Sequence, residues 1–371
     1  MPRREALGRL GLLAGSVLAA LVLAEAGLRA AGYAPELFKS TARLVSADQR
    51  TLLDCYPTNP RGYFDLDLRT PEARERYLSL APRRYEAVAQ RAPWAVEFRY
   101  NAQGFRGEDF PPRRPGVTRV AVLGDSFTEG QGVKEADTLV RVLERLLDRE
   151  EPGRWEVLNC GRRATDFPAL SDVFEQALAQ APDLLVYAMV LNDGDRSPEF
   201  HARQTYVDDW ILDRGRMLIG RPEYQLRPFD SRVAQLVRDR VETWRTSRET
   251  ARWYQEMYAA PNRAGWQRTQ ERLREMDRRV RAGDGRLLVV SWPLLVGLQG
   301  RYPFEDTSRV IAQFLDTAGI ARHDLLPALR GRPDQSLWVH PVDRHPNEVA
   351  NRLAAESLRP IVRRLAAGEP Q

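Results

Sequence analysis

The chain has 371 residues, a formal net charge of +5 and a hydrophobic share of 43%, the balance of a globular protein with room for a sizeable core. The charge is small for this length, so composition indicates no nucleic-acid partner. Two cysteines, Cys55 and Cys160, match no metal-ligand spacing, and sequence alone leaves a disulfide between them open. We predict no metal and no cofactor.

Residues 1–32 have the pattern of a membrane-targeting segment. Arg3, Arg4 and Arg9 precede the uncharged run Leu10–Ala24. Its length suits the apolar core of a signal peptide, and extension through Leu28 approaches the roughly 20 residues that span a bilayer. Basic residues before such a segment keep the amino terminus inside. We predict a retained anchor with the rest of the chain outside the cytoplasm, periplasmic or extracellular; secretion after cleavage and a buried core helix are the alternatives.

Residues 33–117 form an irregular lead-in, rich in Pro, Tyr and Arg. Within it, Phe98–Gly107 alternates and then turns. This pattern predicts either an added edge strand or a segment packed beside the functional edge of the main domain.

The stretch Arg119–Gly130 is the centre of the chain's organisation. Its apolar run, Val120–Leu123, suits a strand of a parallel sheet that is covered on both faces. Gly124 ends the strand and Ser126 follows it, at the sheet edge where ligands gather in such folds.

An α/β alternation continues from there. Strands separated by helices predict βαβ units and a parallel sheet. The expected strands are 120–123, 155–159, 184–190 and 287–292, and the expected helices are 136–149, 168–180, 305–318 and about 346–364.

Residues from about 196 to 283 interrupt this alternation. The segment has no strand of comparable quality, and a stripe of apolar residues at helical spacing predicts a helix, with Val233, Leu236, Val237, Val241 and Trp244 on one side. We predict a helical insertion at the functional edge, where it could cover the site or shape a pocket. We assign no role to His201.

Two further polar blocks follow apolar runs. Asn192-Asp193 comes after the strand 184–190, and Asp343-Arg344-His345-Pro346-Asn347 lies on the loop that enters the last helix. A serine nucleophile needs a base within hydrogen-bond reach, and the base needs an acceptor on its other ring nitrogen. The block Asp343–Asn347 supplies both groups, with His345 as the base and Asp343 as the acceptor.

Together the three blocks resemble the SGNH/GDSL hydrolase family. Gly124-Asp125-Ser126 matches its first block, Asn192-Asp193 its third, and Asp343 with His345 its last, over roughly residues 118–362. The resemblance implies a three-layer α/β sandwich with a parallel sheet flanked by helices, here residues 118–364. It also implies a catalytic triad of Ser126, His345 and Asp343.

The oxyanion hole implied by the resemblance contains the Ser126 backbone N–H, the Asn192 amide and a glycine N–H. That glycine is Ala164 here, so we expect the Ala164 N–H to donate, with Gly161 as the alternative. The family's acid commonly stands three residues before the histidine, where this chain has Val342.

Other histidines compete with His345. His340 is a rival base, but it lacks the asparagine and the helix start that follow His345. We expect His340 and His323 to be structural.

We predict a serine-dependent ester hydrolase that acts on an O-acylated carbohydrate or a small, lipid-like ester. A polysaccharide O-acyltransferase with the same triad is the first alternative. A catalytically weak, membrane-tethered glycan-binding module is the second. A nucleotide-binding enzyme is distant, because Gly124-Asp125-Ser126 lacks the glycine spacing for a pyrophosphate.

Overall fold

The structure is a computed structural model that describes residues 2–33, 42–45, 51–56, 94–163, 169–202, 229–340 and 343–369. The chain forms two compact units, one of residues 1–38 and 204–252 and one of residues 39–203 and 253–371. Ala164, Val342 and most of the lead-in lie outside the described residues.

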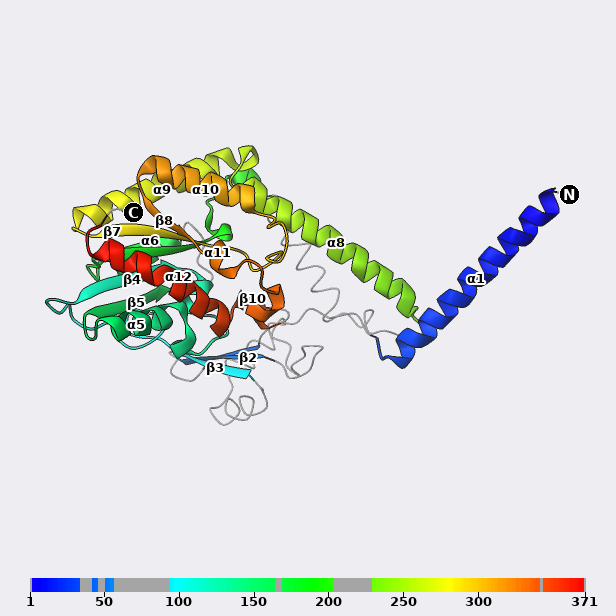
Figure 1. Ribbon diagram of the computed structural model, residues 1–371, viewed down its shortest axis with the longest axis horizontal. Coiled ribbons are helices and arrows are strands. Elements are labelled where there is room, and N and C mark those ends of the chain that lie inside the picture. Colours follow the sequence, from blue (N-terminus) through cyan, green and yellow to red (C-terminus); the bar gives the residue numbers. More distant parts are fainter. Residues whose placement is uncertain are drawn as a thin grey trace. The chain divides into compact units, whose positions relative to one another are not determined.

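The larger unit is built on a five-stranded parallel sheet with strand order β5-β4-β6-β7-β8 (Figure 1). Strands β4, β6 and β7 are rich in Val and Leu and buried along almost their whole length, as expected for strands covered on both faces. The bounds are β4 Thr118–Gly124, β5 Trp155–Gly161, β6 Leu184–Val190, β7 Arg286–Trp292 and β8 Ala321–Asp324.

Strand β8 was not among the strands expected from the sequence. Its sequence Ala-Arg-His-Asp carries no apolar run, because it pairs only with β7 at the edge of the sheet and is half-buried. Edge strands tolerate charged residues that a central strand does not.

Helices cover both faces of the sheet. The helices α5 (Leu139–Glu150) and α12 (Glu348–Ala366) pack against each other on one face, and α6 (Leu170–Leu178), α9 (Arg263–Ala282) and α10 (Glu305–Ala318) lie on the other (Figure 1). Right-handed crossovers require this division, because the chain reverses direction across the sheet after β5. The predicted three-layer fold is confirmed.

The region before β4 contains a separate antiparallel sheet of β1 (Ala42–Val45), β2 (Thr51–Tyr56) and β3 (Trp94–Arg99). The strand expected near Phe98 therefore does not extend the main sheet. A bridge between Tyr100 and Arg106 closes the turn that follows.

The carboxyl-terminal block is more ordered than the predicted loop. Asp343 and His345 lie on a short strand, β10 (Asp343–Pro346), which pairs with β9 (Trp338–His340). Helix α12 begins after Pro346, because the Asn347 side chain caps it by accepting from the N–H groups of its first turn. The remaining short elements are α4 Ser126–Glu129, α11 Leu326–Leu329, η1 Glu135–Asp137, η2 Leu191–Asp193, η4 Ala260–Asn262 and η5 Asp334–Leu337.

Cys160 is a free, buried thiol on β5, so the disulfide with Cys55 that the sequence left open is not formed. Burial raises the pKa of this thiol to about 12.

The smaller unit contains α1 (Pro2–Ala30) and residues 232–252 of α8 (Arg232–Met257). Within α1, Gly8–Ala30 is long and apolar enough to cross a bilayer. The described part of the predicted insertion, residues 196–202 and 229–283, is largely helical, but Val237, Val241 and Trp244 of its apolar stripe are exposed.

Candidate active site

Ser126 is placed at the carboxyl edge of the sheet by a tight strand-to-helix turn. It is the first residue of the four-residue helix α4, and Asp125 caps that helix by accepting from the Phe127 N–H. The helix ends at Gly130, whose left-handed backbone (φ 84°) suits glycine. The first N–H groups of a helix have no partner within it, so the start of α4 can present both the Ser126 hydroxyl and its N–H.

His345 meets that hydroxyl from the other end of the chain. Its Nε2 lies 2.8 Å from Ser126 Oγ, across 219 residues of sequence. The imidazole also packs against the Phe127 ring, 5.3 Å between centroids. A hydroxyl held against an imidazole nitrogen at this distance is the arrangement in which histidine can accept the serine proton.

Asn192 reaches the same site from the end of β6. Its amide nitrogen lies 3.5 Å from an Asp125 carboxylate oxygen, at the long limit of a hydrogen bond. Burial raises the pKa of Asp125. The structure thus brings together Ser126, His345 and Asn192.

Asp193 holds the turn that presents Asn192. Its carboxylate accepts from the Val190 N–H at 2.9 Å and the Tyr187 hydroxyl at 3.0 Å, and it is buried. Burial and the neighbouring Asp125 raise the pKa of Asp193 well above its usual range.

The other predicted site residues differ in how far they are described. The Asp343 backbone lies on β10, but its side chain and the side chain of His340 are outside the described residues, as is Ala164. Gly161 is described, and its N–H donates to Asn159 Oδ1 at 2.9 Å. That bond leaves this N–H engaged within its own loop.

His323 forms a second Ser–His pair. Its Nε2 lies 2.8 Å from Ser357 Oγ, in the body of α12. The Ser357 N–H is committed to the helix, unlike that of a helix-start serine, so this pair lacks a backbone donor beside its hydroxyl.

The sequence reading missed an ionic network behind the nucleophile. Glu129, the last residue of α4, is 1% exposed and accepts from Arg163 Nε at 2.5 Å and from the Tyr100 hydroxyl at 2.9 Å. Arg163 immediately precedes Ala164, so this ion pair joins the nucleophile helix to the loop that was expected to supply an oxyanion donor. A glutamate three residues after the serine was the available signal.

Arg106 supports the same turn from the other side. It is 1% exposed and donates to the carbonyl oxygens of Gly130 at 2.6 Å and Val133 at 2.7 Å. Its guanidinium carbon lies 3.8 Å from the centre of the Phe98 ring. Burial lowers the pKa of Arg106 to about 10. The segment 98–107 thus packs beside the nucleophile turn, one of the two outcomes expected for it.

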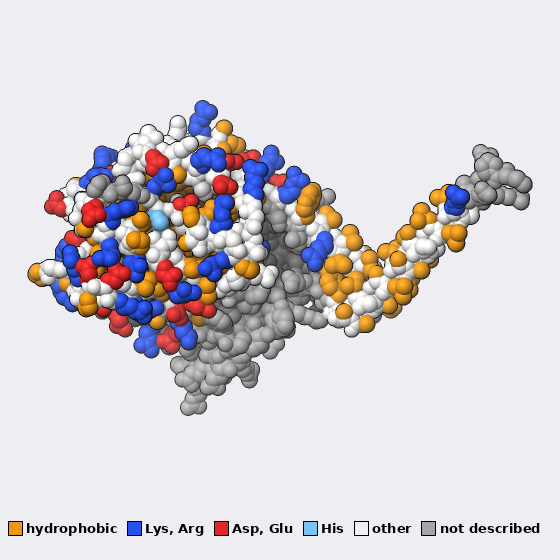
Figure 2. All heavy atoms as spheres, viewed as in Figure 1, with side chains coloured by type: hydrophobic (Ala, Val, Ile, Leu, Met, Phe, Trp, Pro, Cys, Tyr) orange, Lys and Arg blue, Asp and Glu red, His pale blue; other side chains and the backbone are white. Residues whose placement is uncertain are grey.

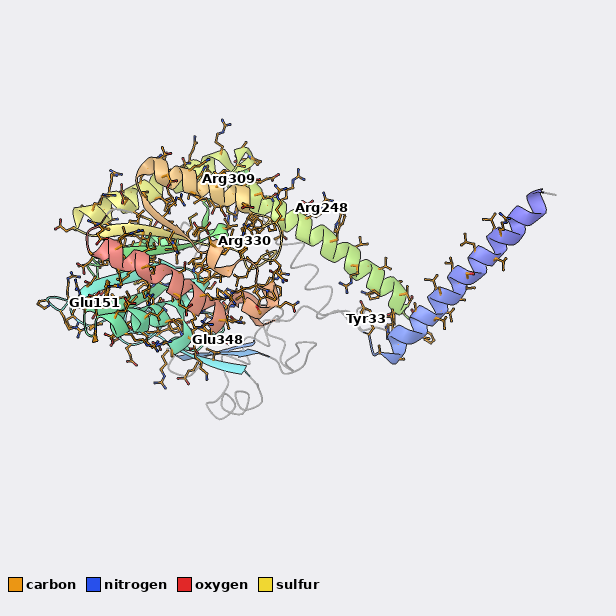
Figure 3. The ribbon with its side chains drawn as sticks, viewed as in Figure 1. Tyr33, Glu151, Arg248, Arg309, Arg330 and Glu348 are labelled. Carbon is orange, nitrogen blue, oxygen red and sulfur yellow. The ribbon has the colours of Figure 1, made fainter. Side chains whose placement is uncertain are left out.

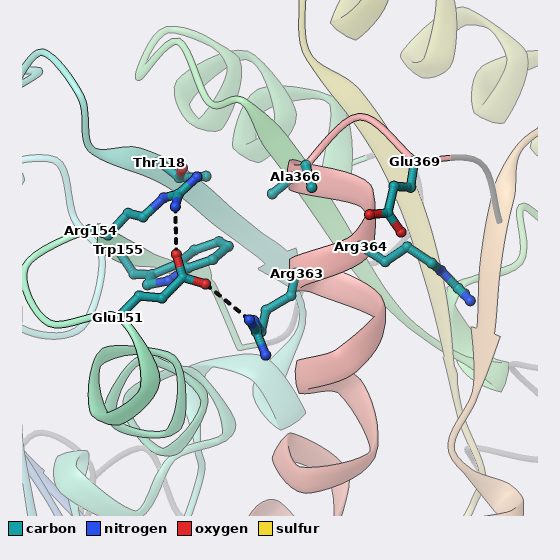
Figure 4. A pocket seen from close by; sticks show the side chains of 9 residues that line it. Thr118, Glu151, Arg154, Trp155, Arg363, Arg364, Ala366 and Glu369 are labelled. Carbon is teal, nitrogen blue, oxygen red and sulfur yellow. Dashed lines mark hydrogen bonds and ion pairs between the residues drawn. The ribbon is translucent and has the colours of Figure 1, made fainter.

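A cavity of about 320 Å³ lies at the other end of the sheet, beside the first residues of β4 and β5 (Figure 4). Its lining includes Glu151, which forms ion pairs with Arg154 and Arg363. Among the described residues, no cluster of three or more His, Cys, Asp or Glu side chains could hold a metal ion.

Part of the sequence matches a known protein family. Residues 122–353, more than half of the chain, match the model of the GDSL-like lipase/acylhydrolase family. The chain belongs to this family. The matched range contains Ser126, Asn192 and His345, the three side chains that the fold brings together.

Several solved structures are similar to this GDSL-like acylhydrolase. They include TesA (17% identity, TM-score 0.41, covering 67% of this chain and 99% of that one). The esterase EstA from Pseudoalteromonas sp. is 12% identical with a TM-score of 0.40, and the match covers 67% of this chain and 99% of EstA. The acetylxylan esterase Axe2 from Geobacillus stearothermophilus is 14% identical with a TM-score of 0.39, and the match covers 67% of this chain and 95% of Axe2. No curated protein matches the chain.

Proposed function

We propose that this GDSL-like acylhydrolase cleaves esters through an acyl-enzyme on Ser126. His345 takes the hydroxyl proton as Oγ attacks the acyl carbonyl, and returns it to the leaving alcohol when the tetrahedral intermediate collapses. Asp343, two residues before the base, orients the imidazole. Water then attacks the acyl-enzyme with His345 again as base, releasing the acid. The observation that supports this proposal is the 2.8 Å contact between Ser126 Oγ and His345 Nε2.

The proposed oxyanion hole consists of the Ser126 N–H, the Asn192 amide and the Ala164 N–H. The position of Ser126 at the start of α4 and the approach of Asn192 favour the first two donors. Ala164 is preferred to Gly161 because the Gly161 N–H already donates to Asn159. Each preorganised donor is worth about 3 kcal/mol of transition-state stabilisation in such sites.

We propose an O-acylated carbohydrate or a lipid-like ester as the substrate, met outside the cytoplasm. The support is the apolar stretch of α1 with arginines before it, the arrangement of an anchor whose amino terminus stays inside.

Hydrolysis of p-nitrophenyl acyl esters by the full chain tests the mechanism. Ser126→Ala and His345→Ala should each lower kcat/KM by at least about a thousandfold, because nucleophile and base act as one unit. Ser357→Ala and His323→Ala remove a Ser–His pair with the same 2.8 Å distance and should leave kcat/KM within about twofold. Equal losses of kcat/KM in the Ser126 and His345 variants and in the Ser357 and His323 variants would contradict the assignment of Ser126 and His345 as nucleophile and base.

The same assay separates the alternatives. Acyl transfer to an added glycan in preference to water would assign the O-acyltransferase reaction. Glycan retention by a chain on which mass spectrometry detects no acylated Ser126 would assign the binding module.

A further inference from the structure

The membrane-spanning candidate α1 is joined to α8 by a specific contact. The Glu25 carboxylate accepts from the backbone N–H groups of Arg232 and Val233, both at 3.0 Å, and from the Ser231 hydroxyl at 3.0 Å. These are the orphan donors at the start of α8, and an acidic group is favoured at that end of a helix. Glu25 thus acts as the amino-terminal cap of a helix that begins 207 residues later.

A second contact lies at the same junction. Arg29, one turn after Glu25, donates to the Asp230 carbonyl oxygen at 3.0 Å and pairs with Glu25 at 2.7 Å. Figure 1 shows the end of α1 and the start of α8 side by side. Ala24-Glu25-Ala26 has the small residues of a signal cleavage site, and a chain cut after Ala26 would lose the cap of α8. The junction therefore favours a retained segment.

The helix that begins at this junction has an exposed apolar stripe. Val237, Val241 and Trp244 follow the i, i+4, i+7 spacing of one helix face and are 56%, 42% and 57% exposed. Phe229, just before the helix, is 95% exposed. The apolar side chains of α1 are exposed in the same unit (Figure 2).

Arginines flank this stripe. Arg240 is exposed beside the stripe, and the exposed Arg248 continues the same helix face one turn after Trp244, with its guanidinium carbon 4.8 Å from the centre of the Trp244 ring. Figure 3 labels Arg248 on α8. Residues 232–252 contain six arginines and three acidic residues. Apolar residues with a tryptophan between arginines are the composition of a helix that lies in the headgroup region of an anionic membrane.

We infer that residues 232–252 of α8 lie on the outer surface of the membrane that α1 spans, with the apolar stripe among the lipid headgroups and Glu25 fastening the helix to the end of the span. The inference rests on the proposed anchor. The occupant of the stripe is an anionic phospholipid surface, because α8 starts where α1 leaves the bilayer and carries excess positive charge.

Probe accessibility in the full chain tests this inference. In a Cys55→Ser background, Cys160 stays buried with its raised pKa and labels poorly. Val241→Cys places an environment-sensitive fluorophore on the stripe, and Glu249→Cys places it at an exposed control position away from the stripe on the same helix. In vesicles of phosphatidylcholine with phosphatidylglycerol, the 241 probe should emit at shorter wavelength and be several-fold less quenched by aqueous iodide than the 249 probe.

Two further measurements complete the design. Omitting phosphatidylglycerol should weaken the protection at 241, because the arginines lose their anionic partners. Glu25→Ala should weaken it as well, while the chain stays in the membrane through an alkaline carbonate wash.

Each contrary outcome has a distinct meaning. Equal quenching at 241 and 249 in a chain that resists the wash overturns the inference alone. Protection at 241 that grows with protein density, with energy transfer between labelled copies, overturns it in favour of a second chain as occupant. A chain that washes off refutes the proposed anchor and the inference together.

Discussion

Replacing Glu129 by glutamine tests the ionic network behind the nucleophile. The change keeps the shape of the side chain and one acceptor for the Tyr100 hydroxyl, but it removes the charge that faces Arg163. The two side chains are 2% and 12% exposed, so water can replace little of the lost interaction. Losing one partner of a buried ion pair costs about 3–5 kcal/mol, and the retained acceptor places this variant at about 3 kcal/mol.

Glu97→Gln is the matched control. Its ion pair with Arg99, 2.6 Å long, has side chains that are 48% and 74% exposed, and such pairs contribute at most about 1 kcal/mol. In urea unfolding, Glu129→Gln should lower the unfolding free energy by about 3 kcal/mol, and Glu97→Gln should lower it by under about 1 kcal/mol. In thermal melts these correspond to shifts of about 6 °C and under about 2 °C.

Catalysis should separate the two variants too. The Glu129–Arg163 pair ties the helix of Ser126 to the loop before Ala164, and a small displacement of reacting groups costs rate steeply. We expect Glu129→Gln to lower kcat about tenfold with KM nearly unchanged. Equal effects of the two substitutions on unfolding free energy and on kcat would refute the reasoning.

Three further predictions follow from single contacts. A Cβ on Gly161 would overlap the backbone of α4, so Gly161→Ala should lower the unfolding free energy by about 3 kcal/mol and remove most of the esterase activity. Gly300 has open space around it, so Gly300→Ala should leave both the thermal melt and the ester hydrolysis rate unchanged. Burial lowers the pKa of His323 below 6.5, so the unfolded state binds more protons between the two values. The unfolding free energy should therefore rise with pH up to about 6.5, by at most about 1.4 kcal/mol per unit, and then level off. His323→Gln should flatten this slope in urea titrations; an unchanged slope contradicts the assignment. Asn347→Ala leaves two N–H groups of α12 without their cap and should cost about 2 kcal/mol in chemical denaturation; a loss below about 0.5 kcal/mol would show that the cap contributes little.

Local pattern in the sequence predicted the central part of the fold. Strands β4, β6 and β7 were recognisable because burial on both faces demands an unbroken apolar run, and α10 because its apolar residues recur at helical spacing. The edge strand β8 was missed for the opposite reason, since a half-buried edge imposes no such run. The strand β10 was missed because its partner, not its composition, makes it a strand.

The sequence by itself determined the central strands, the main helices and the identity of the reactive groups. These groups are Ser126 after a buried strand, Asn192 after another, and His345 before the last helix. Only the tertiary structure decided which groups meet. The imidazole of His345 reaches Ser126 while that of His323 pairs with Ser357, and Glu129 faces Arg163. The physical reason is that the apolar period of a segment depends on its own burial, whereas a hydrogen bond between groups 219 residues apart depends on the order of the strands that carry them.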